Sequence, residues 1–289
     1  MSRPFFYSFV FIASHCFSQQ QFEVHGHRGF RGKFPENTIT AFKEAARAGA
    51  DYIELDVVIS KDSQVVVSHE PWFNAAICSE PDGTPVRKKN QHDLYRMNYS
   101  EIRKYDCGKR GNPKFHDQAK IPEYKPLLSE VIDSIESFTK RNGLPAMKYN
   151  IEIKSNHFGD GKYHPEPAII AKLVGKVISK FNIDERILIQ SFDPRSLRAI
   201  HQLVPSFKIG LLTLKRRSFS NSVRKLDFTP DYLNPRASTC GKTLVSQAHK
   251  NKCKVVPWTV NSADAMQKLK DKGVDGVITD FPDAALKLR

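Results

Sequence analysis

The sequence predicts an α/β protein whose strands close into a (β/α)8 (TIM) barrel, with a capping insertion after the third strand. Two observations favour this fold. From residue 127 onward, short β-branched runs alternate with amphipathic segments of ten or so residues, which is typical of a parallel sheet with helical crossovers. Polar or aromatic residues lie at the C-terminal ends of these runs. In (β/α)8 barrels, the active site lies at the C-terminal ends of the strands.

The N-terminal elements come first. A short apolar run ends at His27-Arg28-Gly29, the sequence PENT then opens a helix, and Gly49 closes that helix. The next run, around 52–59, is rich in Ile, Leu and Val. The segment 61–64 is too short for a crossover helix, so we expect a hairpin with the run that ends at His69.

The later elements follow in strict alternation. The expected strands cover 147–155, 186–192, 207–213, 232–235, 254–260 and 273–280. The expected helices cover 127–142, 166–181, a segment after 193–194, a segment near 220, 244–252 and 263–272. This gives nine candidate strands for eight places in a barrel, and the surplus strand falls in the hairpin.

The segment 71–126 differs in composition from the rest. It is rich in Pro, Lys, Asn and Asp, and its periodicity is weak apart from a short helix around 100–105. Because it follows His69 directly, we expect it to fold over the mouth of the site as a capping insertion. We therefore expect one barrel domain over 21–289 that carries this insertion.

The first twenty residues read as a secretory signal peptide, with Arg3, an apolar run over 5–17 and cleavage near 18–20. The run is too short to cross a membrane. Cys16 raises the alternative of a lipoprotein, which the preceding His15 disfavours, and an uncleaved N-terminal helix is a second alternative. We expect an exported protein, periplasmic or secreted, with no membrane span in the mature chain.

The formal net charge of +14 suits anionic partners such as phosphate esters or acidic headgroups. The basic residues are scattered and no nucleic-acid-binding motif accompanies them, so we expect a small-molecule substrate and no nucleic acid; the oligomeric state is left open. The cysteines beyond residue 20 lack a zinc-binding spacing. Cys78 and Cys107 share one loop-rich segment and are either paired or free thiols.

Three acidic residues are the candidate metal ligands. Glu54 and Asp56 are two residues apart in a strand, so they share one face, and Glu152 ends a later strand. Carboxylates inside apolar strands repel one another unless a cation lies between them. An all-oxygen ligand set favours Ca²⁺ or Mg²⁺ over zinc. The alternative is that they only pair with nearby lysines.

Two histidines are the candidate acid–base pair. If the hairpin turn is centred between Asp62 and Ser63, Asp56 lies opposite His69, and the first strand delivers His27 to the same place. Imidazoles titrate near neutral pH, so one can take a proton from an attacking hydroxyl while the other protonates a leaving alkoxide. Which histidine is the acid stays open, and burial as ordinary core residues is the alternative for each.

The ordered motifs HRG, PENT, GAD-IELDV, KD and VV-H, followed by IEIK, QSF, WTV and TDFP, resemble the glycerophosphodiester phosphodiesterase family over about 250 residues. The resemblance implies metal-dependent hydrolysis of glycerophosphodiesters to sn-glycerol 3-phosphate and an alcohol. Attack by a neighbouring substrate hydroxyl and attack by water both remain open. The alternatives are a phospholipase C- or D-like enzyme that acts on intact lipids, and a non-catalytic barrel that binds glycerophosphodiesters.

Four further residues are expected to bind substrate. Arg28 and Lys154 would hold the phosphate, a role that the resemblance supports, although Lys154 alternatively pairs with the neighbouring carboxylate. Phe192 and Trp258 end later strands and would line the alcohol pocket. Glu70 stands where the family usually has Asp, which puts any supporting role at that position in doubt.

Overall fold

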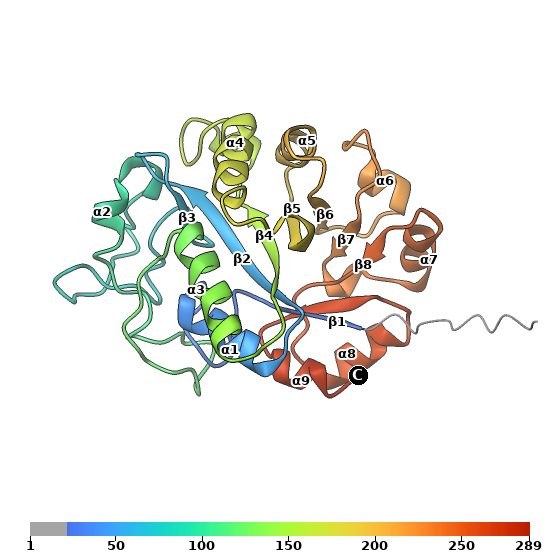
Figure 1. Ribbon diagram of the computed structural model, residues 1–289, viewed down its shortest axis with the longest axis horizontal. Helices are drawn as coiled ribbons and strands as arrows, with labels where there is room; N and C mark the ends of the chain where they lie inside the picture. The colour runs from blue at the N-terminus through green and yellow to red at the C-terminus, as the bar shows by residue number, and fades with distance from the viewer. Residues whose placement is uncertain (1–21) are drawn as a thin grey trace, which may run out of the picture.

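The computed structural model describes residues 22–289, and within this range eight parallel strands form the expected barrel (Figure 1). Hydrogen bonds join them in the order β8-β7-β6-β5-β4-β2-β1-β9. The strands are β1 (Glu23–Gly26), β2 (Tyr52–Ile59), β4 (Lys148–Ile153), β5 (Ile187–Ser191), β6 (Lys208–Thr213), β7 (Tyr232–Pro235), β8 (Lys254–Val255) and β9 (Gly276–Thr279). The ninth strand, β3 (Val65–Val67), pairs antiparallel with β2, so the surplus strand does lie in the hairpin.

Helices surround the strands as an outer ring (Figure 1). They are α1 (Ile39–Ala48), α3 (Leu128–Arg141), α4 (Pro167–Ile178), α5 (Pro194–Leu203), α6 (Phe219–Val223), α7 (Lys242–Lys250), α8 (Ala263–Lys270) and α9 (Pro282–Leu286). The α1 boundaries follow from its sequence. The Thr38 side chain accepts a hydrogen bond from the Ala41 N–H, and Gly49 ends the helix at a φ of 92°, which glycine adopts without strain.

The barrel closes between β8 and β9 through hydrogen bonds outside the regular strands. The expected strand over 254–260 is shortened to two residues, because Pro257 has no N–H to donate. The chain nevertheless continues along its neighbours. The Ile278 N–H donates to the Pro257 carbonyl and the Val260 N–H donates to the Ile278 carbonyl. The barrel is therefore nearly closed.

The expected register of the hairpin is wrong by one residue. Val57 pairs with Val67, so the Ser68 N–H donates to the Asp56 carbonyl and His69 lies one position beyond. The physical reason is the turn, which contains five residues, 60–64, with Ser63 in the left-handed region at a φ of 60°. An odd-numbered turn shifts the register that an even-numbered turn would give.

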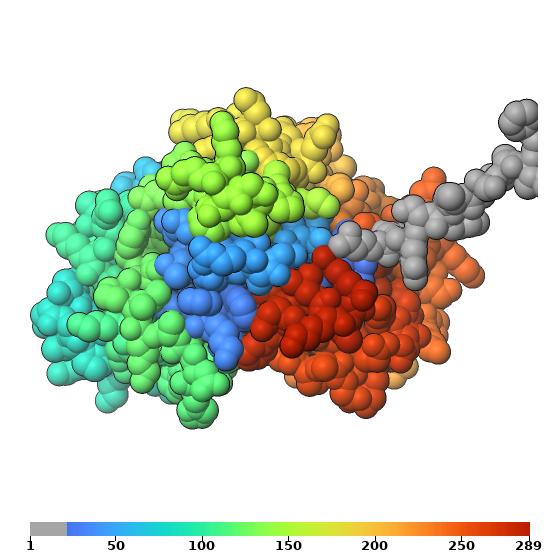
Figure 2. Space-filling view, turned by 60° about the horizontal axis from the view of Figure 1, so that its bottom comes forward, coloured from blue at the N-terminus to red at the C-terminus, as the bar shows by residue number. Residues whose placement is uncertain are grey.

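The segment 71–126 forms a lobe beside the barrel, coloured cyan to green in Figure 2. Its short helices are η1 (Leu94–Arg96) and α2 (Tyr99–Ile102), and a disulfide joins Cys78 to Cys107. The lobe has its own apolar cluster, which packs on Val58 and Val66 of the hairpin. The alternate hairpin residues, such as Val57 and Val65, face the main core. The hairpin is therefore buried on both faces.

The expected signal peptide lies outside the described residues. Among residues 22–289, no helix is both long and apolar enough to cross a membrane.

Candidate active site

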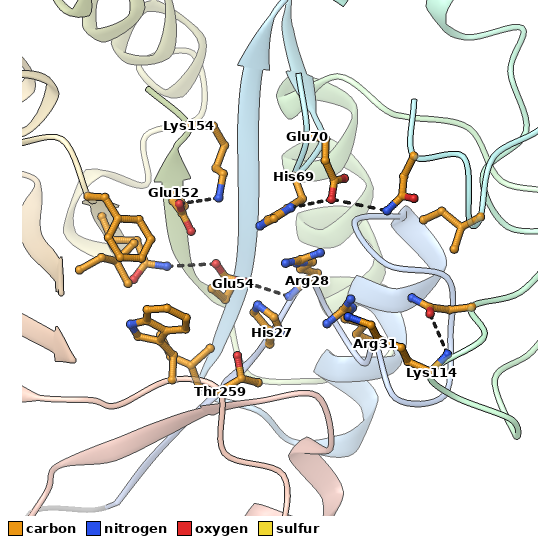
Figure 3. Close-up of a pocket in the computed structure, with 18 of the residues that line it drawn as sticks. His27, Arg28, Arg31, Glu54, His69, Glu70, Lys114, Glu152, Lys154 and Thr259 are labelled. Carbon is orange, nitrogen blue, oxygen red and sulfur yellow. Dashed lines mark hydrogen bonds and ion pairs between the residues drawn. The ribbon is translucent and has the colours of Figure 1, made fainter. Parts of the chain in front are cut away.

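A pocket of about 300 Å³ lies where the strands of the barrel end (Figure 3). It brings together eight of the residues that the sequence singles out: His27, Arg28, Glu54, His69, Glu152, Lys154, Phe192 and Trp258. Glu54 lies within β2 and Glu152 within β4, and the other six residues follow β1, β3, β4, β5 or β8 within three positions. Asp56, the ninth, is not among the residues that line the pocket, but its carboxylate lies close to those of Glu54 and Glu152.

The three predicted acids converge. One carboxylate oxygen of each of Glu54, Asp56 and Glu152 lies within 4.8 Å of the others. The register explains this, because Asp56 of β2 pairs directly with Glu152 of β4, and Glu54 is two residues away on the same face. All three are buried, with Glu54 and Asp56 each only 1% exposed.

Amide side chains hold two of these acids in position. The Gln190 Nε2 group donates to Glu54 Oε1 over 3.0 Å, and the Asn234 Nδ2 group in turn donates to Gln190 Oε1 over 2.7 Å. Asn37 Nδ2 donates to Asp56 Oδ2 over 2.9 Å. Each amide fixes a carboxylate orientation without neutralising its charge, so the cluster keeps its capacity to bind a cation.

The pKa values of the three acids also indicate that the cluster can bind a cation. Burial, together with repulsion from Asp56 and Glu152, raises the pKa of Glu54 well above its usual value. Burial likewise raises the pKa of Glu152, where the opposing attraction of Lys154 is insufficient. Asp56 is buried too, but Lys154, His69 and Arg28 outweigh that effect and hold its pKa below its usual range. Asp56 Oδ1 is buried without a hydrogen-bond partner. A hard divalent cation fits these donors.

Both predicted histidines have a carboxylate partner at Nδ1. His27 Nδ1 lies 2.6 Å from Asp280 Oδ1, and His69 Nδ1 lies 3.0 Å from Glu70 Oε1. The pKa values of Asp280 and Glu70 are both lowered, because hydrogen bonding to the histidines and nearby cations overcome the effect of burial. An ionised partner at Nδ1 keeps the proton there, which leaves Nε2 of each ring free to exchange a proton in the pocket.

His27 and His69 reach the pocket from different elements, His27 from the end of β1 and His69 from beyond β3 (Figure 3). Burial lowers the pKa of His27, and this effect exceeds the opposing influence of Asp280. The expected placement of both rings beside the carboxylates is thus observed, although His69 arrives through a register that differs from the expected one.

Two arginines, Arg28 and Arg31, lie beside the acids. The Arg28 N–H donates to Glu54 Oε2 over 2.8 Å, in a left-handed backbone conformation with a φ of 51°. Its guanidinium pairs with Glu36 at 2.6 Å, and Glu36 also accepts from Arg31 Nε at 2.6 Å. Burial opposes the charge on Glu36, but the two arginines hold its pKa below its usual range. Both guanidinium groups line the pocket.

Lys154 pairs with two of the acids, as the alternative for this residue anticipates. Its Nζ lies 2.7 Å from Glu152 Oε1 and 3.5 Å from Asp56 Oδ1. Burial would lower the pKa of Lys154, but these two carboxylates outweigh it and raise the pKa. The ammonium group therefore stays charged at the edge of the pocket, where it can also contact an anion.

Several lining residues were not singled out in the sequence. Arg31 follows the HRG motif closely, and that proximity is the only signal that marks it. Asn74, Ile77, Asn112 and Lys114 belong to the lobe 71–126 and form one wall of the pocket. The isolated polar residues of a long loop carry no periodic pattern, so only the folded chain reveals which of them reach the site.

A second cavity of about 370 Å³ adjoins the first and shares His69, Glu152, Lys154 and Phe192 with it. Its outer part is more aromatic. It is lined by Trp72, Phe158 and Tyr163, and the rings of Trp72 and Tyr163 meet edge to face with centroids 5.6 Å apart. Trp258 and Phe192 form a similar pair at 5.4 Å on the border of the first pocket. Aromatic side chains thus line the second cavity and the border of the first pocket.

Comparison with known proteins gives consistent matches. The profile of the Glycerophosphoryl diester phosphodiesterase family matches residues 27–284. A glycerophosphodiester phosphodiesterase of Caldanaerobacter subterraneus subsp. tengcongensis is 35% identical over 270 residues, which cover 92% of this chain and 96% of that protein.

Solved structures agree on the fold. A putative glycerophosphoryl diester phosphodiesterase from Silicibacter pomeroyi has a TM-score of 0.84 at 25% identity, with 93% of each chain covered. A phosphodiesterase from Oleispira antarctica, solved with its product sn-glycerol-3-phosphate, has a TM-score of 0.73 at 22% identity and covers 92% of this chain and 95% of its own. The family profile spans nearly the whole chain and the 35% identical relative matches it almost end to end, so this chain belongs to the glycerophosphoryl diester phosphodiesterase family of hydrolases.

Proposed function

We propose that the protein hydrolyses glycerophosphodiesters to sn-glycerol 3-phosphate and an alcohol, with a divalent ion, Ca²⁺ or Mg²⁺, held by Glu54, Asp56 and Glu152. The observation that supports this most is the meeting, in one pocket, of a buried carboxylate cluster and two histidines whose Nδ1 atoms are each held by a carboxylate. When bound, the ion supplies positive charge next to the phosphate. The name of the 35% identical relative points to the same substrate class.

The protein side chains supply the remaining chemistry. Arg28, Arg31 and Lys154 bind the phosphate oxygens, the arginines through their planar guanidinium groups. His27 is the general base, because its lowered pKa leaves it neutral near pH 7 and able to take a proton at Nε2. His69 donates a proton from Nε2 to the leaving alcohol oxygen as the bond from phosphorus to that oxygen breaks. Glu70 Oε1 holds the His69 ring at Nδ1, which leaves Nε2 for this step.

The attacking group is either the glycerol hydroxyl next to the phosphate, which forms a cyclic phosphate that water then opens, or water itself. A substrate in which that hydroxyl is replaced by hydrogen separates the two routes. Loss of turnover supports the hydroxyl as the attacking group, and retained turnover supports water.

The decisive experiment is an assay of glycerol 3-phosphate release from glycerophosphocholine, with and without a chelator. We expect release to stop with the chelator and to return on addition of Ca²⁺ or Mg²⁺. His27→Gln and His69→Gln should each lower kcat by roughly 10²- to 10⁴-fold. His157→Gln is the matched control, because that ring lies outside the pocket with its side chain 82% exposed. Chelator-insensitive release, or no release from any glycerophosphodiester, contradicts the proposal.

A second candidate is hydrolysis of intact lipids in the manner of a phospholipase C or D. The aromatic cavity that adjoins the site favours it, because Trp72, Phe158 and Tyr163 offer apolar surface next to the reacting centre. Headgroup release from phosphatidylcholine or its monoacyl derivative at a rate comparable to that from glycerophosphocholine supports this candidate. Release from the deacylated substrate alone removes it.

We also propose that the protein is exported. Two features support this: the signal-like first twenty residues, and the Cys78–Cys107 disulfide, which is the kind of bond that persists in oxidising compartments. Detection of the mature chain, beginning near residue 21, outside the cytoplasm tests the proposal, and retention of the intact chain in the cytoplasm contradicts it.

A further inference from the structure

Exposed apolar side chains gather at one end of the barrel. Among residues 22–289, five large apolar side chains are exposed, and four of them lie at the end that carries the active site. Phe158 follows β4, Ile169 lies in the first turn of α4, Phe192 follows β5 and Leu214 follows β6. Phe158 is 90% exposed and Leu214 is 55% exposed. The fifth, Leu203, ends α5 at the opposite end of the barrel.

Basic residues occupy the same loops. Leu214 begins the exposed run Leu-Lys-Arg-Arg over 214–217, and exposed Lys162 and Arg236 lie in the loops after β4 and β7. In the part of the chain that the structure describes, none of these five cations forms an ion pair within 4.0 Å. We call this set, Phe158, Lys162, Ile169, Phe192, 214–217 and Arg236, the rim.

The acids of these loops do not neutralise the rim. Asp160 and Asp193 both pair with Arg195, at 2.6 and 2.7 Å, so these three groups together leave one negative charge. Exposed Glu166, just before α4, adds a second negative charge in the loops after β4 to β7, against the five cations of the rim. The rim therefore combines protruding apolar side chains with an excess of positive charge.

We propose that the rim docks the catalytic end of the barrel onto the surface of an anionic phospholipid bilayer. Separate apolar side chains on adjacent loops can each enter the boundary between headgroups and acyl chains, while lysines and arginines beside them contact acidic headgroups. A protein partner would favour a continuous apolar patch with a charged border rather than single side chains that alternate with arginines. Docking of this kind turns the mouth of the pocket towards the lipid surface, and it does not depend on the proposed chemistry.

The test is sedimentation of the full chain with vesicles of phosphatidylglycerol mixed with phosphatidylcholine, and with vesicles of phosphatidylcholine alone. We expect binding to the anionic vesicles that weakens as salt is added. Each cation near an anionic surface contributes about fivefold to partitioning, so Arg216→Gln with Arg217→Gln should weaken binding by roughly 25-fold. Phe158→Asp with Leu214→Asp should weaken it by at least about tenfold.

Leu203→Asp is the matched control, because Leu203 is 51% exposed, nearly the same as Leu214, but lies at the other end of the barrel. It should bind vesicles like the wild type. Every variant carries the same first 21 residues, so binding through that segment would affect all of them equally. Unchanged turnover of soluble glycerophosphocholine in the double arginine variant shows that it is folded. Equal vesicle binding by all variants, or none by the wild type, overturns the proposal.

Discussion

Replacement of Glu152 by Gln should separate metal binding from stability. In the metal-free protein, ionised Glu152 is unfavourable, because its pKa is raised by burial in spite of Lys154. A carboxyl group whose pKa is higher in the folded state than in the unfolded state destabilises the fold as the pH rises above the unfolded pKa, and the full loss of stability is reached above the folded pKa. At pH 7.5, metal-free Glu152→Gln should therefore be at least as stable as the metal-free wild type.

With the divalent ion the order should reverse. An ion present at about 100 times its Kd adds roughly 2.7 kcal/mol to the stability of the protein that binds it, which corresponds to a rise of about 5 to 10 °C in Tm for a domain of this size. Glu152→Gln removes one ligand of three, so most of this rise should disappear. Thermal unfolding followed by circular dichroism, with chelator and then with Ca²⁺ or Mg²⁺, measures both effects.

Glu136→Gln is the matched control. Glu136 pairs with Arg186 at 2.6 Å and accepts a hydrogen bond from Tyr149 at 2.7 Å, away from the pocket. Burial opposes its charge, but these partners lower its pKa, so its loss should reduce stability while leaving the metal-induced rise intact. If Glu152→Gln keeps the full metal-induced rise, Glu152 is not a ligand of the ion. If it destabilises the metal-free protein as Glu136→Gln does, ionised Glu152 is not unfavourable there.

Three further predictions follow from the contacts. Asp280→Asn removes the partner that raises the pKa of His27, so the acid limb of the plot of kcat/KM against pH should move to lower pH. We also expect kcat to fall by about a hundredfold. An acid limb that does not move argues against His27 as the base. Glu23, 8% exposed, has its pKa lowered to about 2 because His25 and Lys254 outweigh burial, so Glu23→Gln should cost about 3 kcal/mol in unfolding measurements at pH 7. That cost should shrink as the pH falls from 4.5 to about 2. A cost that does not change with pH contradicts a stabilising role for the ionised Glu23 carboxylate. Reduction of the Cys78–Cys107 disulfide, which spans 29 residues, should lower the free energy of unfolding by roughly 3 to 4 kcal/mol. Denaturant titrations with and without reductant measure this difference, and coincident unfolding curves would exclude a stabilising disulfide.

The acidic cluster was predictable from local rules. Alternation along β2 fixes Glu54 and Asp56 on one face, and Glu152 ends a strand that a parallel barrel places beside them. The placement of Phe192 and Trp258 in the same pocket followed from the rule that strand ends meet at one edge. These expectations needed only the period of the strands and the fold class.

Other features depended on contacts that no local pattern encodes. The left-handed Ser63 adds a residue to the hairpin turn, and nothing in KDSQ distinguishes that turn from an even-numbered one. The sequence PENT at the start of α1 contains two polar residues of the type that caps helices, Asn37 and Thr38. Thr38 takes that role, and Asn37 is thereby free to hold Asp56. Glu70 was in doubt as a supporting residue, but its longer side chain still reaches His69.

The most direct test of the account is a crystal structure of the protein with Mn²⁺, as an anomalous substitute for the native ion, and glycerol 3-phosphate. We expect one ion bound by Glu54, Asp56 and Glu152, with the phosphate between it and the guanidinium of Arg28. Nε2 of His27 and Nε2 of His69 should each lie within hydrogen-bond distance of a phosphate oxygen, on opposite sides of phosphorus. An ion bound elsewhere, or a phosphate that either ring fails to reach, would contradict the account.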